Sequence, residues 1–198
     1  MINIWIKFIN TLFTIFMQEQ VRSAGELAFI GVIIQLAGLL LGGLATLAGY
    51  VVELIAIQRL SEAFNNPAIW RNALNAVITA IVGTVVLVAS IFAFIFGFPL
   101  LPIPMNPYLY PLLYIGIAAA IFVVAYVFVL LSGRYYRDLY NELANSSGIS
   151  EFRDAAKWTW LGALLFIVIV GAILALVGRI FALLGYNRLK EWKPPQQT

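Results

Sequence analysis

The stretch from Leu27 to Ile57, LAFIGVIIQLAGLLLGGLATLAGYVVELIAI, decides how this chain can be folded. It is an almost unbroken apolar block of about 30 residues, which as one helix would extend ~45 Å. The hydrocarbon core of a bilayer is ~30 Å thick and is spanned by about 20 helical residues. The block is therefore too long for one pass and short for two, and the pair Gly42-Gly43 at its centre is where a turn would fit.

Three further apolar blocks follow, Ala73–Phe98, Tyr108–Leu131 and Trp158–Tyr186. The two middle blocks each suit one tilted span, whereas the last is again about 30 residues long. Of the 198 residues, 63% are hydrophobic and 11% are charged. A soluble domain is about 45–50% apolar and about 25% charged. We therefore predict an all-α, polytopic protein of the cell membrane, with the lipid bilayer as its first partner.

Lysine and arginine concentrate in short cytoplasmic loops, so their positions distinguish four long helices from six segments. With four long, tilted helices the basic residues divide five against six and show no asymmetry. If the outer blocks turn back near Gly42-Gly43 and near Gly171, eleven of the twelve fall on one side. This favours six segments with both termini cytoplasmic, although arms of about 15 residues are short for spanning helices. The eleven residues are Lys7, Arg22, Arg59, Arg71, Arg134, Arg137, Arg153, Lys157, Arg188, Lys190 and Lys193.

The ends of the chain differ from the blocks between them. In residues 1–22, polar side chains recur every three or four positions, which predicts an amphipathic helix lying in the membrane interface. A partially inserted anchor is the alternative. Residues 23–191 form the predicted transmembrane domain, and residues 192–198 a polar tail.

An internal repeat is expected, because residues 42–62 align with residues 171–191 and both copies end in Arg-Leu-x-Glu. Each copy carries a stripe of small residues, and small side chains let helix backbones approach closely in lipid. We expect the two stripes to pack against each other; self-association is the competing use. The stripes comprise Gly42, Ala45, Gly49 and Ala56, and Gly171, Ala175, Gly178, Ala182 and Gly185.

Two ionisable residues, Glu53 and Arg179, lie inside the apolar blocks, where charged groups are costly and commonly functional. Glu53 follows Gly49 by four positions and so shares its helix face. Arg179 directly follows Gly178. Three placements are open: both side chains extend to the nearby interface, they form a structural ion pair, or they serve transport.

Composition excludes several classes of function. Without cysteine or histidine the chain has no disulfide, no thiolate nucleophile and no histidine-based catalytic triad or metal site. Its net charge of +3 does not suggest a nucleic-acid partner. No enzyme motif and no cofactor signature is present, so we expect a non-enzymatic protein without a cofactor.

Two regions of sequence resemble a known family. The segments GYVVELIAIQRLSE (49–62) and NPAIWRNA (66–73) are similar to its first half, and FRDAA (152–156), GALL (162–165) and VGAIL (170–174) to its second. The family comprises archaeal integral membrane proteins and is known only as a domain of unknown function. The resemblance covers about residues 24–190. It implies an archaeal origin and a polytopic helical fold, and it transfers no catalytic residue.

These observations give two functional hypotheses. The first is a scaffold, an accessory subunit of a larger membrane complex or a membrane-organising protein that acts through helix packing. An interfacial helix combined with short hairpins resembles proteins that fill one leaflet more than the other and so bend the membrane. The second is a small ion or solute channel or transporter that uses Glu53 and Arg179.

Overall fold

The computed structural model describes residues 2–41, 43–97 and 109–194, and within these ranges it contains helices and no strand. Five of the helices are long and apolar enough to cross a membrane, and α5 is the exception. The all-α, polytopic fold predicted from the composition is thus confirmed. The elements are α1 (Ile2–Leu41), α2 (Gly43–Ala63), α3 (Pro67–Phe92), the π-helical turn η1 (Ala93–Gly97), α4 (Tyr110–Ser147), α5 (Glu151–Leu164) and α6 (Ile169–Leu189).

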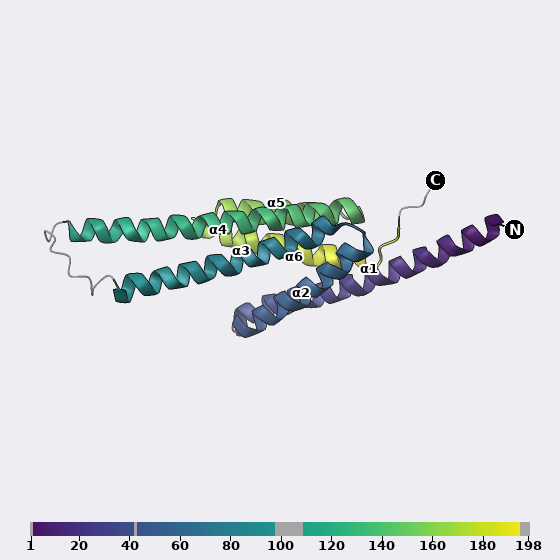
Figure 1. Ribbon diagram of the computed structural model, residues 1–198, viewed down its shortest axis with the longest axis horizontal. Helices are drawn as coiled ribbons and strands as arrows, with labels where there is room; N and C mark the ends of the chain where they lie inside the picture. The colour runs from purple at the N-terminus through teal and green to yellow at the C-terminus, as the bar shows by residue number, and fades with distance from the viewer. Residues whose placement is uncertain (1, 42, 98–108, 195–198) are drawn as a thin grey trace.

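The helices form three antiparallel pairs (Figure 1). Helices α1 and α2 make the first hairpin, α3 and α4 the long central pair, and α5 and α6 the second hairpin. The start of α1, the end of α6, and the α2–α3 and α4–α5 connections all lie at one end of the bundle (Figure 1). We call this the charged end, because the basic residues of the sequence gather in these segments. The six-segment arrangement is correct, and four long helices are not observed.

The first hairpin turns where the sequence predicts, near Gly42-Gly43, whereas the second turns earlier than predicted. In the first hairpin α1 ends at Leu41 and α2 begins at Gly43; residue 42 lies outside the described residues. The second turns at residues 165–168, so the turn predicted near Gly171 is wrong by a few positions. A single glycine does not end a helix, and Gly171 lies in the first turn of α6 instead. A Cβ atom there would overlap the backbone of Leu165 and Phe166, so this glycine lets the turn close tightly.

Residues 2–22, predicted as a separate amphipathic helix, form the first part of a longer one. Helix α1 is continuous from Ile2 to Leu41, and the predicted boundary at residue 22 falls in its middle. No proline or glycine interrupts the sequence there until Gly25, which helices tolerate at modest cost. The first half of α1 exposes its aromatic side chains, with Phe13 67% and Phe16 63% exposed.

The core of the bundle lies toward the charged end, where all six helices meet. Its largest fully buried side chains include Leu60 of α2, Ile69 of α3, Tyr140 of α4 and Phe152 of α5. Trp192, assigned from the sequence to the polar tail, belongs to this core. Its indole N–H donates to the carbonyl of Ser147 at 2.9 Å, and its ring packs edge-on against Phe64. The packed core therefore extends beyond residue 191, the predicted end of the domain.

The α2–α3 connection is fastened by one asparagine. Asn66 is the N-cap of α3, and its side-chain oxygen accepts a hydrogen bond from the backbone of Ala68 at 3.1 Å, with Pro67 as the first helical residue. The side-chain nitrogen of Asn66 donates to Glu142 at 3.0 Å and to Ser146 at 3.1 Å. One side chain thus starts α3 and ties it to the last turns of α4.

Away from the charged end, α3 and α4 extend farther than the two hairpins (Figure 1). The hydroxyl of Tyr126 on α4 donates to the carbonyl of Leu164, the last residue of α5, at 2.7 Å. Helix α4 begins at Tyr110, so ~24 Å of it lies beyond that hydrogen bond at 1.5 Å per residue. The described part of the molecule therefore tapers from six helices to the α3–α4 pair.

Candidate functional site

Glu53 of α2 and Arg179 of α6 form an ion pair inside the bundle. The Nη1 atom of Arg179 lies 3.0 Å from Oε1 and 3.1 Å from Oε2 of Glu53. The side chain of Glu53 is 3% exposed and that of Arg179 is 17% exposed. Of the three placements that the sequence left open, the structure shows the two side chains together rather than extended separately toward the interface.

The carboxylate of Glu53 has partners on both oxygen atoms. Besides Arg179, the side-chain amide of Gln35 donates to Oε2 at 2.7 Å, and the hydroxyl of Tyr186 donates to Oε1 at 3.2 Å. A buried charge is tolerated when it is paired and its remaining lone pairs are hydrogen-bonded. These donors come from α1 and α6, so Glu53 links three helices at one point.

The guanidinium group of Arg179 is held on its faces as well as at one edge. Its Nη1 also donates to the hydroxyl of Tyr140 at 3.0 Å. Its central carbon lies 4.8 Å from the ring centroid of Tyr136 and 5.3 Å from that of Tyr50, within the range of cation–π attraction. Arginine stacks on aromatic faces because its guanidinium is planar. The side chain is thereby fixed in one orientation.

The aromatic partners of Arg179 were not predicted as part of a site. Tyr136 and Tyr140 follow the apolar block of α4 and have the sequence position of an aromatic belt at the interface. Their four-residue spacing, and the three-residue spacing of Tyr50 and Glu53, place each pair on one helix face. That periodicity was the available signal, but it does not say which helices face each other.

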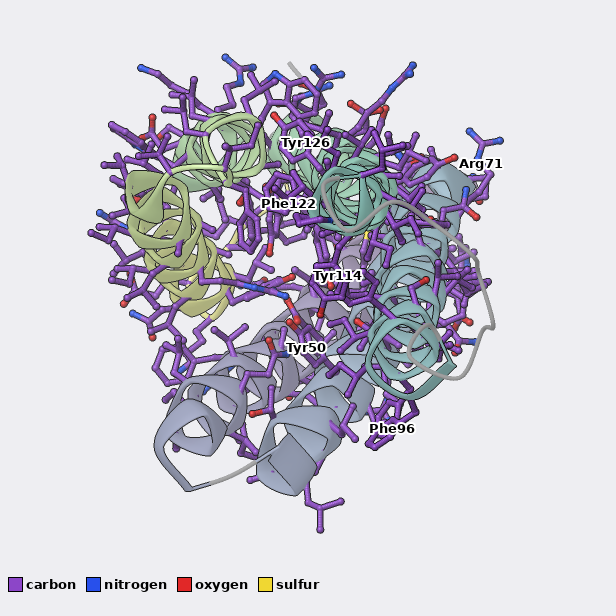
Figure 2. All side chains as sticks on the ribbon, turned by 90° about the vertical axis from the view of Figure 1, so that its left-hand side faces the viewer. Tyr50, Arg71, Phe96, Tyr114, Phe122 and Tyr126 are labelled. Carbon is purple, nitrogen blue, oxygen red and sulfur yellow. The ribbon has the colours of Figure 1, made fainter. Side chains whose placement is uncertain are left out.

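A cavity of about 570 Å³ adjoins the ion pair and is bounded by α1, α2, α4, α5 and α6. Figure 2 views the bundle from the end opposite the charged end and shows Tyr50 on the inward side of its helix. On another wall, the hydroxyl oxygen of Thr159 is buried and has no hydrogen-bond partner among the described residues. The polar residues on the walls are Gln35, Thr46, Ser132, Thr159 and Arg179, together with Tyr50 and Tyr136.

The small-residue stripes do not meet each other as expected. A Cβ atom on Gly49 would lie 2.6 Å from the backbone nitrogen of Gln35 on α1, and one on Gly178 would lie 2.7 Å from that of Thr159 on α5. Each stripe thus packs against the first arm of its own hairpin. The expectation is wrong because tight turns already hold the arms of a hairpin side by side, so close approach occurs there first.

The other stripe residues fit the same arrangement. Ala56 and Ala182 are fully buried, while Ala45 and Ala175 are partly exposed. A Cβ on Gly185 would lie 2.7 Å from the ring of Phe152, and Gly162 of α5 meets the backbone of Ala175. Gly42 lies outside the described residues. In the two aligned copies, Gly49 and Gly178 occupy equivalent places, each on the second arm of a hairpin.

The described residues contain no group of three or more acidic or other metal-binding side chains that could hold a metal ion. The site therefore consists of one charge pair, its hydrogen-bond donors, three tyrosine rings and an adjoining, mostly apolar cavity. Such an arrangement can hold helices together or receive a small molecule.

Comparisons with known proteins match the chain to proteins without an assigned role. A family model described as "Protein of unknown function (DUF996)" matches residues 45–180. The chain is 25% identical over 172 residues to "Uncharacterized protein MJ1644" of the archaeon Methanocaldococcus jannaschii, a match that covers 87% of this chain and 94% of that protein. No solved structure matches.

Proposed function

The chain belongs to the DUF996 family of proteins of unknown function, and we propose that it organises the membrane as a tapered, non-enzymatic scaffold. The family resemblance found in the sequence is confirmed, and it brings no activity with it. The proposal comes from the shape of the molecule. We further propose that the protein lies in the cell membrane with both termini and the charged end on the cytoplasmic side.

The observation that carries the proposal is the unequal length of the helices. The hairpins end near the level of the hydrogen bond between Tyr126 and Leu164, whereas α3 and α4 continue beyond it. If the membrane surface lies at Arg134 of α4, the hairpins end ~12 Å below it, at the level of Tyr126. Six helices would then occupy the nearer leaflet of the ~30 Å core and two the farther one. A protein with unequal cross-sections in the two leaflets favours curvature toward its narrow side.

The first half of α1 supports the same role. Its exposed aromatic and aliphatic side chains continue past the level where the other helices begin (Figure 1). An apolar helical surface of this kind binds at the boundary of head groups and acyl chains. Because the first half is continuous with the rest of α1, its exposed apolar side chains would contact lipid beside the charged end and widen that end of the molecule.

The site around Glu53 supports a scaffold by joining the two hairpins. Arg179, Gln35 and Tyr186 all donate to the same carboxylate, so the charge is engaged from α1 and α6. A larger membrane complex or a second copy of the chain remains a candidate partner for the outer surfaces, in line with a scaffold role.

The test is reconstitution of the full chain into unilamellar vesicles at increasing protein-to-lipid ratios. We expect smaller vesicles or tubules by electron cryo-microscopy. The matched variant is Phe13→Ser with Phe16→Ser; both side chains are exposed, so the fold should be kept and curvature partly lost. Unchanged vesicle size at full incorporation of the protein would contradict the proposal.

A channel or transporter is the second candidate, and the cavity beside Arg179 is the observation that favours it. It predicts an ion- or pH-dependent flux that Glu53→Gln abolishes while the protein still assembles. Flux no greater than that of empty vesicles, for each ion tested, would exclude this candidate without affecting the scaffold proposal.

A further inference from the structure

One edge of the Arg179 guanidinium is unused. Its hydrogen bonds to Glu53 and Tyr140 all come from Nη1. Within the residues that the structure describes, Nε and Nη2 donate to no acceptor. Arg179 is also a wall residue of the cavity, and its side chain keeps 17% exposure. The N–H groups of Nε and Nη2 are therefore available to a molecule that enters the cavity.

This edge has the geometry of a receptor for two oxygen atoms. The Nε and Nη2 groups of an arginine form a planar fork that binds carboxylates and phosphates through two parallel hydrogen bonds. Tyr50 and Tyr136 hold the plane of the fork, and Glu53 and Tyr140 hold its opposite edge. Such preorganisation lowers the entropy lost on binding.

The charge of the site indicates which head group fits. Glu53 neutralises the charge of Arg179 through Nη1, so the ion pair has no net charge when no ligand is bound. A head group with one negative charge would bring the cluster to a single net charge, whereas a multiply charged anion would meet stronger repulsion from Glu53. A carboxylate or a phosphate diester is the chemistry that this balance favours.

The rest of the cavity is suited to an apolar chain. Its other walls carry Leu36, Val129, Ala163, Phe166, Ala172 and Leu176. A volume of about 570 Å³ lies within the range of sites that bury a small molecule, ~300–1,000 Å³. An apolar lining with a few convergent polar groups is the usual composition of such sites.

The cavity also reaches the outer surface of the helices. Phe166 and Leu176 line it, yet they are 50% and 42% exposed. Both lie on the second hairpin, at or after the turn that follows α5. In a bilayer this surface faces hydrocarbon, so a ligand would enter from the lipid phase. This favours an amphiphile over an ion dissolved in water.

From these observations we infer that the cavity binds a single-chain amphiphile with a monoanionic head. The carboxylate or phosphate of the head accepts two hydrogen bonds from Nε and Nη2 of Arg179. The alkyl chain of the amphiphile lies along the apolar walls toward Phe166 and Leu176. This site is independent of the curvature proposed above, because it depends on the interior of the bundle and not on its taper.

The experiment measures the thermal unfolding midpoint of the full chain in a neutral detergent with increasing palmitate. A ligand that binds the folded state raises this midpoint with concentration. Hexadecanol supplies the chain without the charge, and acetate supplies the charge without the chain. We expect palmitate to raise the midpoint clearly more than either. An equal effect of hexadecanol would overturn the role of Arg179, and an equal effect of acetate would show a site for soluble anions instead.

Two neighbouring substitutions test where the alkyl chain of palmitate binds. Ala172→Phe would fill the cavity, whereas Ile173→Phe adds a ring at the next position, whose side chain is 57% exposed. Palmitate partitions into detergent micelles equally for both variants. We expect at least a tenfold loss of apparent affinity in A172F and none in I173F. Equal affinities in the two variants would place the ligand elsewhere and overturn the inference.

The head-group contact is tested by Arg179→Gln combined with Glu53→Gln. The double variant removes both charges together and so leaves neither one buried without a partner. We expect the difference between palmitate and hexadecanol to disappear. If the difference persists in the double variant, Arg179 does not bind the head. If this variant does not fold, the comparison of A172F with I173F still decides the matter.

Discussion

Glu53 and Arg179 lie 126 positions apart in the sequence, and their side chains meet at 3.0 Å in the interior of the bundle. The contact joins the second arms of the two hairpins, α2 and α6. No other described ion pair joins these two helices, since the remaining pairs lie within one helix or link α5 with α6. The consequences of this pair for stability can be measured directly.

Removing one charge of the Glu53–Arg179 pair should lower the free energy of unfolding more than removing both. Glu53→Leu leaves the Arg179 guanidinium without its counter-ion, and breaking a buried pair in this way costs about 3–5 kcal/mol. Combining it with Arg179→Leu removes the uncompensated charge and should recover much of that loss. The measurement is the free energy of unfolding in detergent for both single variants and the double variant. Equal losses in the single and double variants would show that the pair is not coupled.

Trp192 should stabilise the fold although it follows the last helix. Trp192→Phe removes the hydrogen bond to Ser147 and should cost about 1 kcal/mol, while Trp192→Ala also leaves a hole beside Phe64 and should cost about 3–5 kcal/mol. The control is Lys193→Ala, which changes an exposed neighbour. If all three variants unfolded like the parent protein, the residues after α6 would not be part of the core.

Replacing glycine by alanine should lower the stability at a helix contact but not at a position that faces open space. Gly49→Ala places a methyl group 2.6 Å from the backbone nitrogen of Gln35 and should separate the arms of the first hairpin. Gly116→Ala meets no atom within 4 Å and should be neutral or stabilising by up to about 1 kcal/mol, because alanine favours helix. The unfolding midpoints of the two variants test this. A stable G49A variant would contradict the close packing.

The hydrogen bonds that the Glu151 carboxylate accepts should make the stability of the fold depend on pH. The pKa of Glu151 is lowered by a backbone N–H bond at the start of α5, and further by Ser150 and by Arg188, whose Nε lies 3.0 Å away. Because the pKa is lower in the folded protein, the contribution is present above the ordinary value of 4.5 and is lost as the pH falls through the folded value. Glu151→Gln should flatten the acid side of the stability profile. An unchanged profile would assign acid sensitivity to other carboxylates.

The arrangement of the loops can be tested by labelling, because the chain has no cysteine of its own. Single variants Gln20→Cys and Asn145→Cys lie on exposed positions toward the charged end, whereas Leu109→Cys lies at the start of α4. With a membrane-impermeant thiol reagent on sealed vesicles, the first two should react from one side and the third from the other. Reaction of residues 20 and 145 from opposite sides would rule out the hairpins.

Much of the fold could be predicted from the sequence, because the main signals are either short motifs or properties added up over whole segments, such as hydrophobicity and charge. The apolar blocks, together with the rule that basic residues lie on one side of the membrane, indicate how often the chain turns. The pair Asn66-Pro67 marks the start of α3. The place of the second turn was missed, because short loops in apolar sequence carry little composition signal. The docking of the stripes was also missed, since a small residue such as Gly178 does not identify the helix that it faces.

The candidate site was only partly accessible to the same reasoning. Glu53 and Arg179 stand out because charge is rare within apolar blocks. Tyr50, Tyr136 and Tyr140 do not, because tyrosine is common near membrane interfaces. Their convergence on one guanidinium depends on how α2, α4 and α6 are rotated about their axes. That rotation is set by packing across the whole bundle, which no single segment of the sequence contains.

The unequal reach of the helices has a consequence for the surrounding lipid. Acyl chains beside α3 and α4 would contact an apolar helix surface along the full depth of a bilayer. Beside the second hairpin, the apolar surface ends at the turn, Leu165–Val168. Lipids adapt to such differences by stretching, tilting or thinning, at a modest energy per ångström of mismatch. A single molecule would thus impose two local thicknesses on its neighbours, one along each flank.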